Sequence, residues 1–389
     1  MRLTRRKWKI TAGKVDNVVK VLFLIHDLGH GGAEKVLVNL VNNMDRTKFD
    51  ISVIALFGGG VNEQFLKPHI HYRAIFPKVF RGNIHVMKLL TPKQLHKWFI
   101  KERYDIEVSY LEGPSARIIS GCPDPDTKLV TWIHIQQVSA KSSSRSFRSV
   151  RETMACYNRF DRIVGVSETV KKTFLNVLPV EPEMQVLYNT NESEIIRKNA
   201  LECVEPELFD PQGIKLIGVG KLVKNKGFDR ILPIIKRLRA EGHPVHLYLL
   251  GVGPMQQELE EYAQKNGISH AVTLLGYQTN PYKYVSKCDL FVCASYAEGF
   301  STAATEALIV GTPVCTVEVS GMKEMLGDND EWGIVTDNEE EALYQGIKKL
   351  MDDPALLAYY KKQAAERGNA FSTENTVKAV EAMLEDLIQ

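Results

Sequence analysis

The sequence predicts an α/β protein built from two doubly wound domains that face each other across a cleft. Its 389 residues are too many for one ordinary hydrophobic core. Short apolar runs alternate with amphipathic runs, and this alternation restarts after the polar segment 191–212, the expected linker. We therefore expect a basic tail over 1–18, an N-terminal domain over 19–195, a C-terminal domain over 196–370 and a final segment over 371–389.

In the N-terminal half, apolar runs of strand length lead into polar loops or helical patterns. The first run, Val19–Ile25, is followed by a glycine-rich loop and a helix expected over Ala33–Asn42. Strands separated by helices indicate a parallel sheet, which places ligands at the carboxyl ends of its strands. The other expected strands are 49–56, 71–75, 106–110, 128–133, 160–167 and 186–189, and the other expected helices are 62–67, 84–101 with a break near Pro92, and 168–176.

The C-terminal half shows the same alternation, although no close internal sequence repeat is visible. Proline at 254 stands where the first turn of a helix is expected. The sequence ends with a Ser-Thr-Glu cap at 372–374 and an expected helix over 375–387. The expected strands of this half are 215–219, 245–250, 272–275, 289–293, 314–315 and 332–335.

The net charge of +2 conceals an asymmetry between the halves. Residues 1–200 hold 31 Lys and Arg against 19 Asp and Glu, whereas the remaining residues hold 18 against 28. A basic half suggests an anionic partner, either a membrane surface or a nucleic acid. There is no apolar signal core and no run of about 18 uncharged apolar residues, so a cytoplasmic location is expected. The six cysteines lack a Cys-x-x-Cys pair and are expected to be reduced.

The most informative stretch runs from Glu298 to Glu306, between two expected strands. Its glycine and serine are typical of a loop that opens a helix. Free backbone N–H groups of Ser301 and Thr302 would then lie at a positive helix N-terminus, where a phosphate can bind. The two glutamates lie just before the helix and one turn inside it, which suits hydroxyl groups on either side of that phosphate. A sugar nucleotide has this layout, with a diphosphate between the hydroxyls of a sugar and those of a ribose.

Two lysines lie in the loop after the first strand of the C-terminal half. Lys221 and Lys226 follow Gly220 at the sheet edge where the Glu298 stretch is also expected. Two ammonium groups beside a helix N-terminus can carry the charge of a diphosphate without a metal, and can stabilise it as a leaving group. Solvated surface charge is the alternative interpretation of the pair. Tyr277, after another strand, offers a ring surface for a base.

Three loops of the N-terminal half follow expected strands. Gly29–Gly32 is not a dinucleotide fingerprint, so it either approaches a ligand or forms only a tight turn. Tyr110–Gly113 supports a site and a purely structural turn equally. His134 ends a strand, where a histidine favours contact with a ligand over a structural role alone.

Neither a metal nor a cofactor is expected. An Asp-x-Asp pair can hold a divalent cation under a diphosphate, but Asp124 and Asp126 lie in a proline turn before a strand, away from the ligand edge. Asp328 and Asp330 follow no nearby strand. The His and Cys residues are not at zinc spacing.

Four motifs in a fixed order carry a family resemblance: Gly31-Gly32-Ala33-Glu34, Gly220-Lys221-Leu222 with Lys226-Gly227, Glu298-Gly299-Phe300 with Glu306-Ala307, and Gly311-Thr312-Pro313-Val314. With them the chain resembles the retaining glycosyltransferases of family four, which have the GT-B fold. The resemblance covers nearly the whole chain after about residue 18. It implies two Rossmann-like domains, with the acceptor largely on the first, the donor nucleotide on the second, and a last helix that crosses back to the first.

The resemblance also implies roles for individual residues. Glu298 would bind hydroxyls of the donor sugar, Glu306 those of the ribose, and the two lysines the diphosphate. His134 matches the family's histidine at the donor sugar. The expected catalytic residues are His134, Lys221, Lys226 and Glu298, and the expected donor-binding residues are Gly31, Gly32, Gly220, Tyr277, Gly299, Phe300, Ser301, Thr302 and Glu306.

Two positions depart from the family's usual pattern. Lys221 stands where arginine is frequent and loses the bidentate geometry of a guanidinium, and Ser301 stands where proline is common. The expected reaction moves a sugar from a nucleotide-diphosphate sugar, with a UDP-sugar as the expected donor, to a hydroxyl with retention of anomeric configuration. The sequence identifies no carboxylate on the far face of the sugar for a covalent route, and the family resemblance favours same-face attack, in which the leaving phosphate helps accept the proton of the acceptor.

The acceptor is expected to be a saccharide or a lipid-linked saccharide of a bacterial surface polysaccharide. Between 76 and 101, lysines interleave with apolar residues, which indicates either a face resting on anionic lipid at the inner side of the cell membrane or an ordinary amphipathic helix. Two alternatives belong to other classes. A non-catalytic sugar-nucleotide-binding protein would not need both lysines and both glutamates, and no aromatic-basic RNA motif supports nucleic-acid binding.

Overall fold

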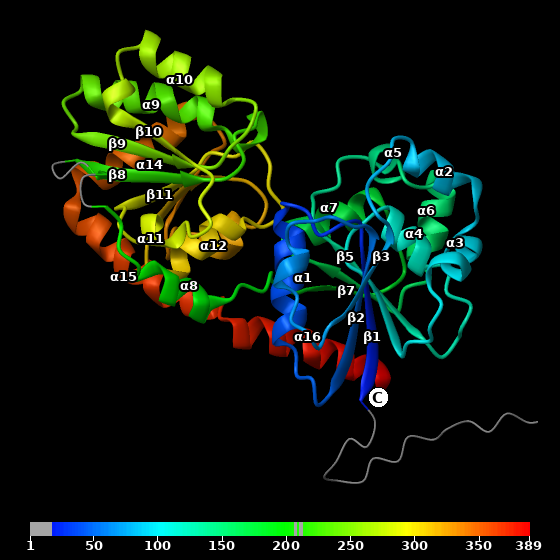
Figure 1. Ribbon diagram of the computed structural model, residues 1–389. Coiled ribbons are helices and arrows are strands. Elements are labelled where there is room, and N and C mark those ends of the chain that lie inside the picture. Colours follow the sequence, from blue (N-terminus) through cyan, green and yellow to red (C-terminus); the bar gives the residue numbers. More distant parts are fainter. Residues whose placement is uncertain (1–17, 206–207, 210–212) are drawn as a thin grey trace, which may run out of the picture.

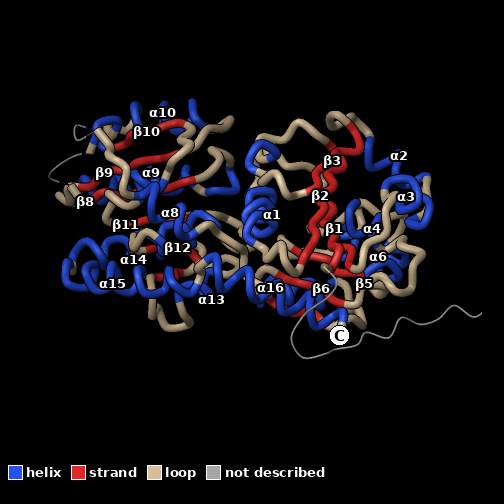
Figure 2. The backbone as a smooth tube through the Cα atoms, turned by 60° about the horizontal axis from the view of Figure 1, so that its bottom comes forward, coloured by secondary structure: helices blue, strands red, loops and turns tan. Residues whose placement is uncertain are grey.

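The computed structural model describes residues 18–205, 208–209 and 213–389, so residues 1–17 of the expected tail lie outside the described residues. Two α/β lobes lie side by side, each with a central sheet and helices around it (Figure 1). Figure 2 shows the same division from a second direction, with strands at the centre of each lobe. The predicted architecture of two parallel-sheet domains is therefore confirmed.

The N-terminal sheet is parallel throughout, in the order β3-β2-β1-β4-β5-β6-β7. From β1 the strands follow in sequence order toward one edge of the sheet, and from β4 they follow in sequence order toward the other. The β1–β4 pair is therefore the switch point, where a doubly wound sheet leaves a crevice for ligands. Every residue of β1 except Lys20 is buried. The strands are β1 (Val19–Ile25), β2 (Phe49–Phe57), β3 (His71–Phe76), β4 (Ile106–Ser109), β5 (Lys128–Ile133), β6 (Arg162–Gly165) and β7 (Met184–Val186).

Local capping explains where several helices of this domain begin. The Thr91 side chain accepts a hydrogen bond from Gln94 N, and the side-chain oxygen of Gln94 accepts one from Thr91 N. Pro92 fills the first turn. Ser167 caps the helix that begins at Glu168 by accepting a hydrogen bond from Val170 N, as expected. The helices are α1 (Gly32–Asn43), α2 (Asn83–Leu89), α3 (Pro92–Phe99), α4 (Pro114–Ile119), α5 (Ala140–Ser143), α6 (Val150–Tyr157) and α7 (Glu168–Val177), with a 3-10 turn η1 (Glu63–Phe65).

Three local differences from the expected elements have simple causes. The helix expected over 62–67 is only the 3-10 turn η1. Helix α4 was not expected, because six residues are too few to display a helical period. Helix α6 begins at a Ser149 cap inside the segment 139–151, where the sequence predicts a flexible basic loop because its polar residues mask the helical pattern.

The C-terminal sheet is also parallel, in the order β10-β9-β8-β11-β12-β13. Its strands are β8 (Ile214–Val219), β9 (Val245–Leu250), β10 (Val272–Gly276), β11 (Leu290–Cys293), β12 (Val314–Val317) and β13 (Ile334–Thr336). Its helices are α8 (Ser193–Ala200), α9 (Phe228–Ala240), α10 (Gln256–Lys265), α11 (Tyr282–Val285), α12 (Thr302–Ile309), α13 (Met322–Leu326), α14 (Glu340–Asp352) and α15 (Pro354–Ala370), with turns η3 (Lys224–Lys226) and η4 (Ser269–Ala271).

The expected linker is partly folded. Helix α8 lies within the segment 191–212 and packs on α11 and α12. The Asn280 side chain donates to Asn199 O at 2.9 Å, and Ser286 Oγ donates to Ala200 O at 3.0 Å. Part of this segment therefore belongs to the C-terminal domain rather than to a free connection.

The last helix, α16 (Thr373–Ile388), crosses back to the N-terminal domain (red in Figure 1). Glu381 Oε1 accepts a hydrogen bond from Asp45 N at 2.6 Å, just after α1, and Glu385 pairs with Lys48 at 2.9 Å. Buried Val380 and Leu384 supply the apolar contact. The crossing helix implied by the family resemblance is thus confirmed.

Candidate active site

The loops at the carboxyl edges of the two sheets contact each other, and the region between the two domains is called the cleft below. A Cβ built on Gly299 would lie 1.9 Å from the carbonyl oxygen of His134, so only glycine allows this approach between the domains. One built on Gly32 would lie 3.6 Å from Thr302 Oγ1, an ordinary contact. Helix α1, which begins at Gly32 after the Gly31 cap, therefore faces the start of α12 (Figure 1).

The helix expected after Glu298 begins where the sequence indicated. Ser301 is the N-cap of α12, with extended backbone, and its side chain accepts a hydrogen bond from Ala304 N at 3.3 Å. Serine thus replaces the family's usual proline while still ending the loop and starting the helix. This leaves the N-terminus of an eight-residue helix at the cleft, where unpaired N–H groups favour an anion.

Glu298 and Lys226 meet within the C-terminal domain. Lys226 Nζ lies 2.6 Å from Glu298 Oε1, and Ser295 Oγ donates to the same oxygen at 2.6 Å. Gly227 makes the contact possible: it has φ +67°, and a Cβ there would lie 1.8 Å from the Ala294 carbonyl oxygen. The predicted neighbours are therefore brought together by a tight approach of the loop after β8 to the end of β11.

The remaining residues expected around the donor lie at the same edge. The Lys221 side chain is exposed and makes no hydrogen bond among the described residues, but its charge interacts with Glu34 of the other domain. Burial raises the pKa of the Glu34 carboxyl, and the charge of Lys221 lowers part of that shift. Tyr277 is 63% exposed, with its ring 6.5 Å from that of His30. Gly220 lies against the aliphatic part of Lys226.

Phe300 is placed differently from the other expected donor-binding residues. Its side chain is buried between the rings of Tyr188 and Phe371, at centroid distances of 5.1 and 5.9 Å. An apolar side chain in this packing stabilises the loop rather than facing the polar groups of the cleft. Only the backbone of Phe300 remains for contact with a ligand.

His134 lies at the end of β5 with a buried ring. Burial lowers its pKa to about 4, opposed in part by a hydrogen bond from the ring to the carbonyl of Tyr110. Because Nε2 has no partner among the described residues, the nitrogen that donates to Tyr110 is Nδ1. The ring is therefore neutral, and its acceptor nitrogen Nε2 has no donor among the described residues.

Glu112 orders this side of the cleft, a role that the sequence left undecided. Its carboxylate accepts from His134 N at 3.1 Å and also bonds the backbone of Ile135. Burial raises the pKa of Glu112, while these backbone N–H groups lower part of that shift. The carboxylate therefore fixes the backbone of the loop that carries His134.

Glu306 meets a residue that the sequence did not single out. Lys35 Nζ, from α1 of the other domain, lies 2.6 Å from Glu306 Oε1 and 2.8 Å from the hydroxyl of Tyr282. Tyr282 in turn donates to Glu306 Oε1 at 3.1 Å. Lys35 directly follows the Gly-Gly-Ala-Glu motif, and that position was the one available sequence signal.

Further contacts hold the domains together beside the site. Glu324 of α13 accepts from the backbone N–H groups of Glu168 and Thr169 at 2.8 and 3.2 Å, which caps α7 of the other domain. The hydroxyls of Ser167 and Ser320 form a hydrogen bond across the interface, with 3.0 Å between their oxygens. The two domains are thus in direct polar contact.

The side chains that could bind a metal lie away from the cleft residues described above. Within the described part of the chain, one group of three such side chains is found: His96, Glu107 and Cys122, all buried in the N-terminal domain. His96 Nε2 already pairs with Glu107 at 2.8 Å. Asp124 and Asp126 both pair with Arg103, in a turn before β5.

Two family profiles match the chain, one on each domain. Residues 204–367 match "Glycosyl transferases group 1", and residues 30–190 match "Glycosyltransferase Family 4". The Rhizobium meliloti lipopolysaccharide core biosynthesis glycosyltransferase LpsD is 30% identical over 85% of this chain and 88% of its own. A Campylobacter jejuni N-acetylgalactosamine-N,N'-diacetylbacillosaminyl-diphospho-undecaprenol 4-alpha-N-acetylgalactosaminyltransferase is 27% identical over 90% of this chain and 95% of its own.

Solved structures show the same fold at low identity. Anabaena HepE in complex with UDP superposes with a TM-score of 0.76, at 18% identity, over 94% of this chain and all of that chain. The lipopolysaccharide outer core galactosyltransferase WaaB gives 0.70 at 16% identity, over 94% and 99%. The fold is therefore GT-B. The chain belongs to the family 4 glycosyltransferases and is a glycosyltransferase.

Proposed function

We propose that this protein transfers a sugar from a UDP-sugar to a hydroxyl of a saccharide or lipid-linked saccharide, with retention of anomeric configuration. Support for the donor comes from HepE, whose structures contain UDP and UDP-glucose. Support for the acceptor comes from the Campylobacter relative, whose name specifies an undecaprenol diphosphate-linked saccharide and an alpha linkage. The family resemblance supports retention.

The observation that carries the proposal is the placement of the Lys226–Glu298 pair beside the N-terminus of α12 and opposite His134. The ammonium groups of Lys221 and Lys226 would pair with a diphosphate bound at the helix N-terminus. Glu298 would then turn to the hydroxyls of the donor sugar. His134 Nε2, a buried acceptor without a partner among the described residues, would accept a hydrogen bond from another hydroxyl of the donor sugar.

Catalysis follows from what changes during the reaction. Negative charge grows on the leaving diphosphate as the bond to the sugar breaks, so Lys221, Lys226 and the α12 amides stabilise the transition state more than the ground state. In a same-face route the leaving phosphate accepts the proton of the acceptor hydroxyl. The lysines and amides supply the charge that a metal supplies in other enzymes, so we propose metal-independent transfer.

Donor turnover tests this proposal directly. A thermal-shift screen of nucleotide sugars identifies the donor, since a ligand at about 100 times its dissociation constant adds about 2.7 kcal/mol to the free energy of unfolding. Hydrolysis or transfer of that donor is then measured with added EDTA. A protein that binds a nucleotide sugar but never breaks its glycosidic bond would be the non-catalytic alternative, and loss of turnover in EDTA would refute metal independence.

A second part of the proposal concerns the region around α2 and α3. Val86, Leu89 and Trp98 are exposed there, Leu89 to 79%, together with Lys93 and Lys97. Apolar side chains among ammonium groups suit the headgroup region of an anionic bilayer, where each charge adds about 1 kcal/mol. We propose that this region rests on the membrane and brings the cleft to a lipid-linked acceptor. No described helix is long and apolar enough to cross a bilayer.

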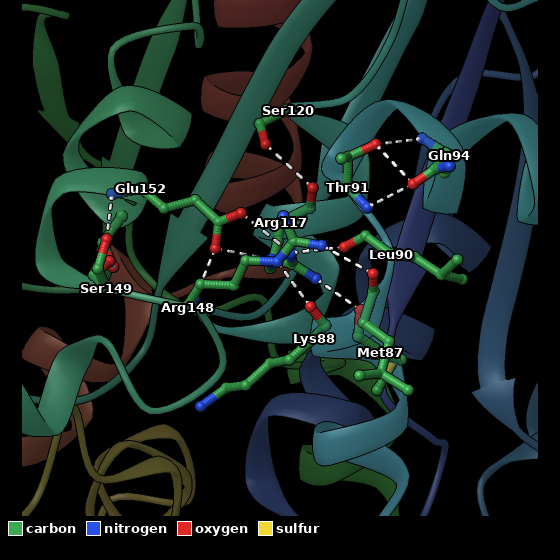
Figure 3. A network of polar contacts seen from close by, with 12 residues as sticks. Met87, Lys88, Leu90, Thr91, Gln94, Arg117, Ser120, Arg148, Ser149 and Glu152 are labelled. Carbon is green, nitrogen blue, oxygen red and sulfur yellow. Dashed lines mark hydrogen bonds and ion pairs between the residues drawn. The ribbon is translucent and has the colours of Figure 1, made fainter.

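Two arginines, the buried Arg117 and the exposed Arg148, bond the end of α2 (Figure 3). Arg117 donates to Met87 O at 2.9 Å and to Leu90 O at 2.7 Å, and it pairs with Glu152. Arg148 donates to the carbonyls of Lys88 and Leu89, at 2.6 and 2.8 Å. Four consecutive carbonyls at the end of α2 are thus satisfied, and cations lie at the negative end of the helix. A short helix with exposed apolar residues is therefore rigidly attached.

Flotation with vesicles tests the membrane part. We expect recovery with vesicles containing phosphatidylglycerol, little with neutral phosphatidylcholine, and a marked loss in Leu89→Asp. Tyr359→Asp serves as a matched control, because Tyr359 is an exposed aromatic residue of α15 in the other domain. Equal recovery with both vesicle types would refute membrane binding while leaving glycosyl transfer untouched.

A further inference from the structure

The contact between α1 and α12 joins the domains at one carboxylate. Lys35 Nζ, Tyr282 OH and Glu306 Oε1 lie within 3.1 Å of one another, and Lys35 is the only one of the three that comes from the N-terminal domain. Glu306 is 8% exposed, so its charge requires a partner. When the domains separate, Lys35 leaves with α1 and only the tyrosine hydroxyl remains.

The contacts are unevenly divided between the two oxygens of Glu306. Lys35 and Tyr282 both bond Oε1, whereas Oε2 has no hydrogen-bond partner among the described residues. Contacts to one oxygen fix the orientation of a carboxylate, and therefore the position of its second oxygen. That oxygen can accept further hydrogen bonds from a ligand. Glu306 lies one turn inside α12, on the same helix whose N-terminus faces the cleft.

The charge state of the contact agrees with this arrangement. Burial would lower the pKa of Lys35, but the adjacent Glu306 carboxylate raises it above its usual value. The ammonium group is therefore charged while it bonds the carboxylate. Since the Lys35 side chain is still 42% exposed, it can leave Glu306 without crossing a packed core.

We propose that Lys35 is a positioning residue for the nucleotide: on closure of the cleft it holds Glu306 Oε1 and thereby directs Oε2 to the ribose hydroxyls. The inference rests on the proposed function, which places a nucleoside diphosphate at α12. It assigns part of the ribose recognition to the N-terminal domain. Nucleotide binding and domain closure then strengthen each other, because each orders the same carboxylate.

The test compares two ligands in matched variants. UDP and 2',3'-dideoxy-UDP share the base and the diphosphate and differ only in the ribose hydroxyls. We expect the wild type to prefer UDP, and Lys35→Met to lose about tenfold in UDP affinity, the size of one hydrogen bond to a charged group, with little change for the dideoxy ligand. Lys35→Arg keeps a donor and is expected to keep most of the preference.

Controls separate positioning from a general weakening of the interface. Lys48→Met removes another lysine of the N-terminal domain, which pairs with Glu385 of α16 at 2.9 Å, and should leave both affinities unchanged. Glu306→Gln should lose the preference by itself, and adding Lys35→Met should then change little.

Each other outcome has a definite meaning. Equal weakening of both ligands in Lys35→Met would make Lys35 a structural clamp only. Tighter UDP binding would show that it competes with the ribose. Either result overturns the inference while the proposed function stands. If the wild type binds no nucleoside diphosphate, including those of other bases, the proposed function fails and the inference fails with it.

Discussion

The charged groups of the cleft are paired differently in the two domains. In the C-terminal domain, Lys226, Glu298 and Ser295 satisfy one another without help from the other lobe. In the N-terminal domain, His134 has a buried nitrogen with no partner among the described residues, and Lys35 finds its partner only across the cleft. The Lys226–Glu298 pair is complete within one domain, whereas His134 and the Lys35–Glu306 pair are completed only by a ligand or by the other domain.

This difference suggests a division of work. A self-paired site can stay folded and charged while the cleft is open, so the C-terminal domain can receive the donor first. The unpaired acceptor of His134 costs free energy until a hydroxyl reaches it, which favours closure with the donor bound. Removing groups from each side should therefore affect different steps.

The largest effect is expected from the self-paired side. Removal of either partner, by Glu298→Gln or Lys226→Met, is expected to lower kcat about 10²–10³-fold, the usual effect of losing one group that stabilises developing charge. Lys224→Met is the matched control, because this neighbouring lysine of η3 pairs with Asp229 at the surface. Steady-state kinetics of transfer measure the effect. Turnover near that of the wild type in either site variant would show that the reaction occurs elsewhere.

The next effect is expected from the side that lacks a partner. His134→Ala is expected to lower kcat/KM about 100-fold, because a buried hydroxyl of the donor loses its acceptor. His270→Ala, at an exposed histidine of the other domain, should change nothing. The pKa of His134 lies at about 4, below its usual value of about 6.5, so the ring is neutral at neutral pH. The pH–rate profile should therefore show no inflection from this ring above about pH 5.

A smaller effect concerns stability rather than the cleft. Burial alone would lower the pKa of His96, but Cys122 and Glu107 raise it to about 9. A folded pKa above the usual value of about 6.5 gives stability that is present below pH 6.5 and lost as the pH rises through 9. We expect a loss of about 3 kcal/mol across this range, measured by urea unfolding. In His96→Gln the pH dependence should largely disappear while the nucleotide affinity stays the same.

The smallest effect is expected at the edge of the domain interface. Glu324→Gln weakens the cap that Glu324 provides for α7, worth about 1 kcal/mol for a helix N-terminus, so KM should rise about fivefold with little change in kcat. Glu318→Gln is the control, since Glu318 pairs with Lys323 on the surface near α13. A fall in kcat of Glu324→Gln without a change in KM would mean that closure follows donor binding in a later, rate-limiting step.

Most elements could be predicted from the sequence because their signals are local. The alternation of apolar strands and helices, the serine caps at 167 and 301, and the glycine-rich loops depend on residues a few positions apart. The two parallel sheets and the start of α12 followed from them. The short helices α4 and α6 did not, because tertiary contacts rather than periodicity stabilise them.

The sequence alone determined the fold class, the family and the residues that carry the motifs, including Lys226, Glu298 and Glu306. Only the tertiary structure decided how these residues are paired. Lys35 and Glu306 are 271 positions apart and meet because two helices from different domains face each other across the cleft. The neutral state of His134 likewise depends on burial by the surrounding elements. Pairing and desolvation are properties of packing, and no local pattern encodes them.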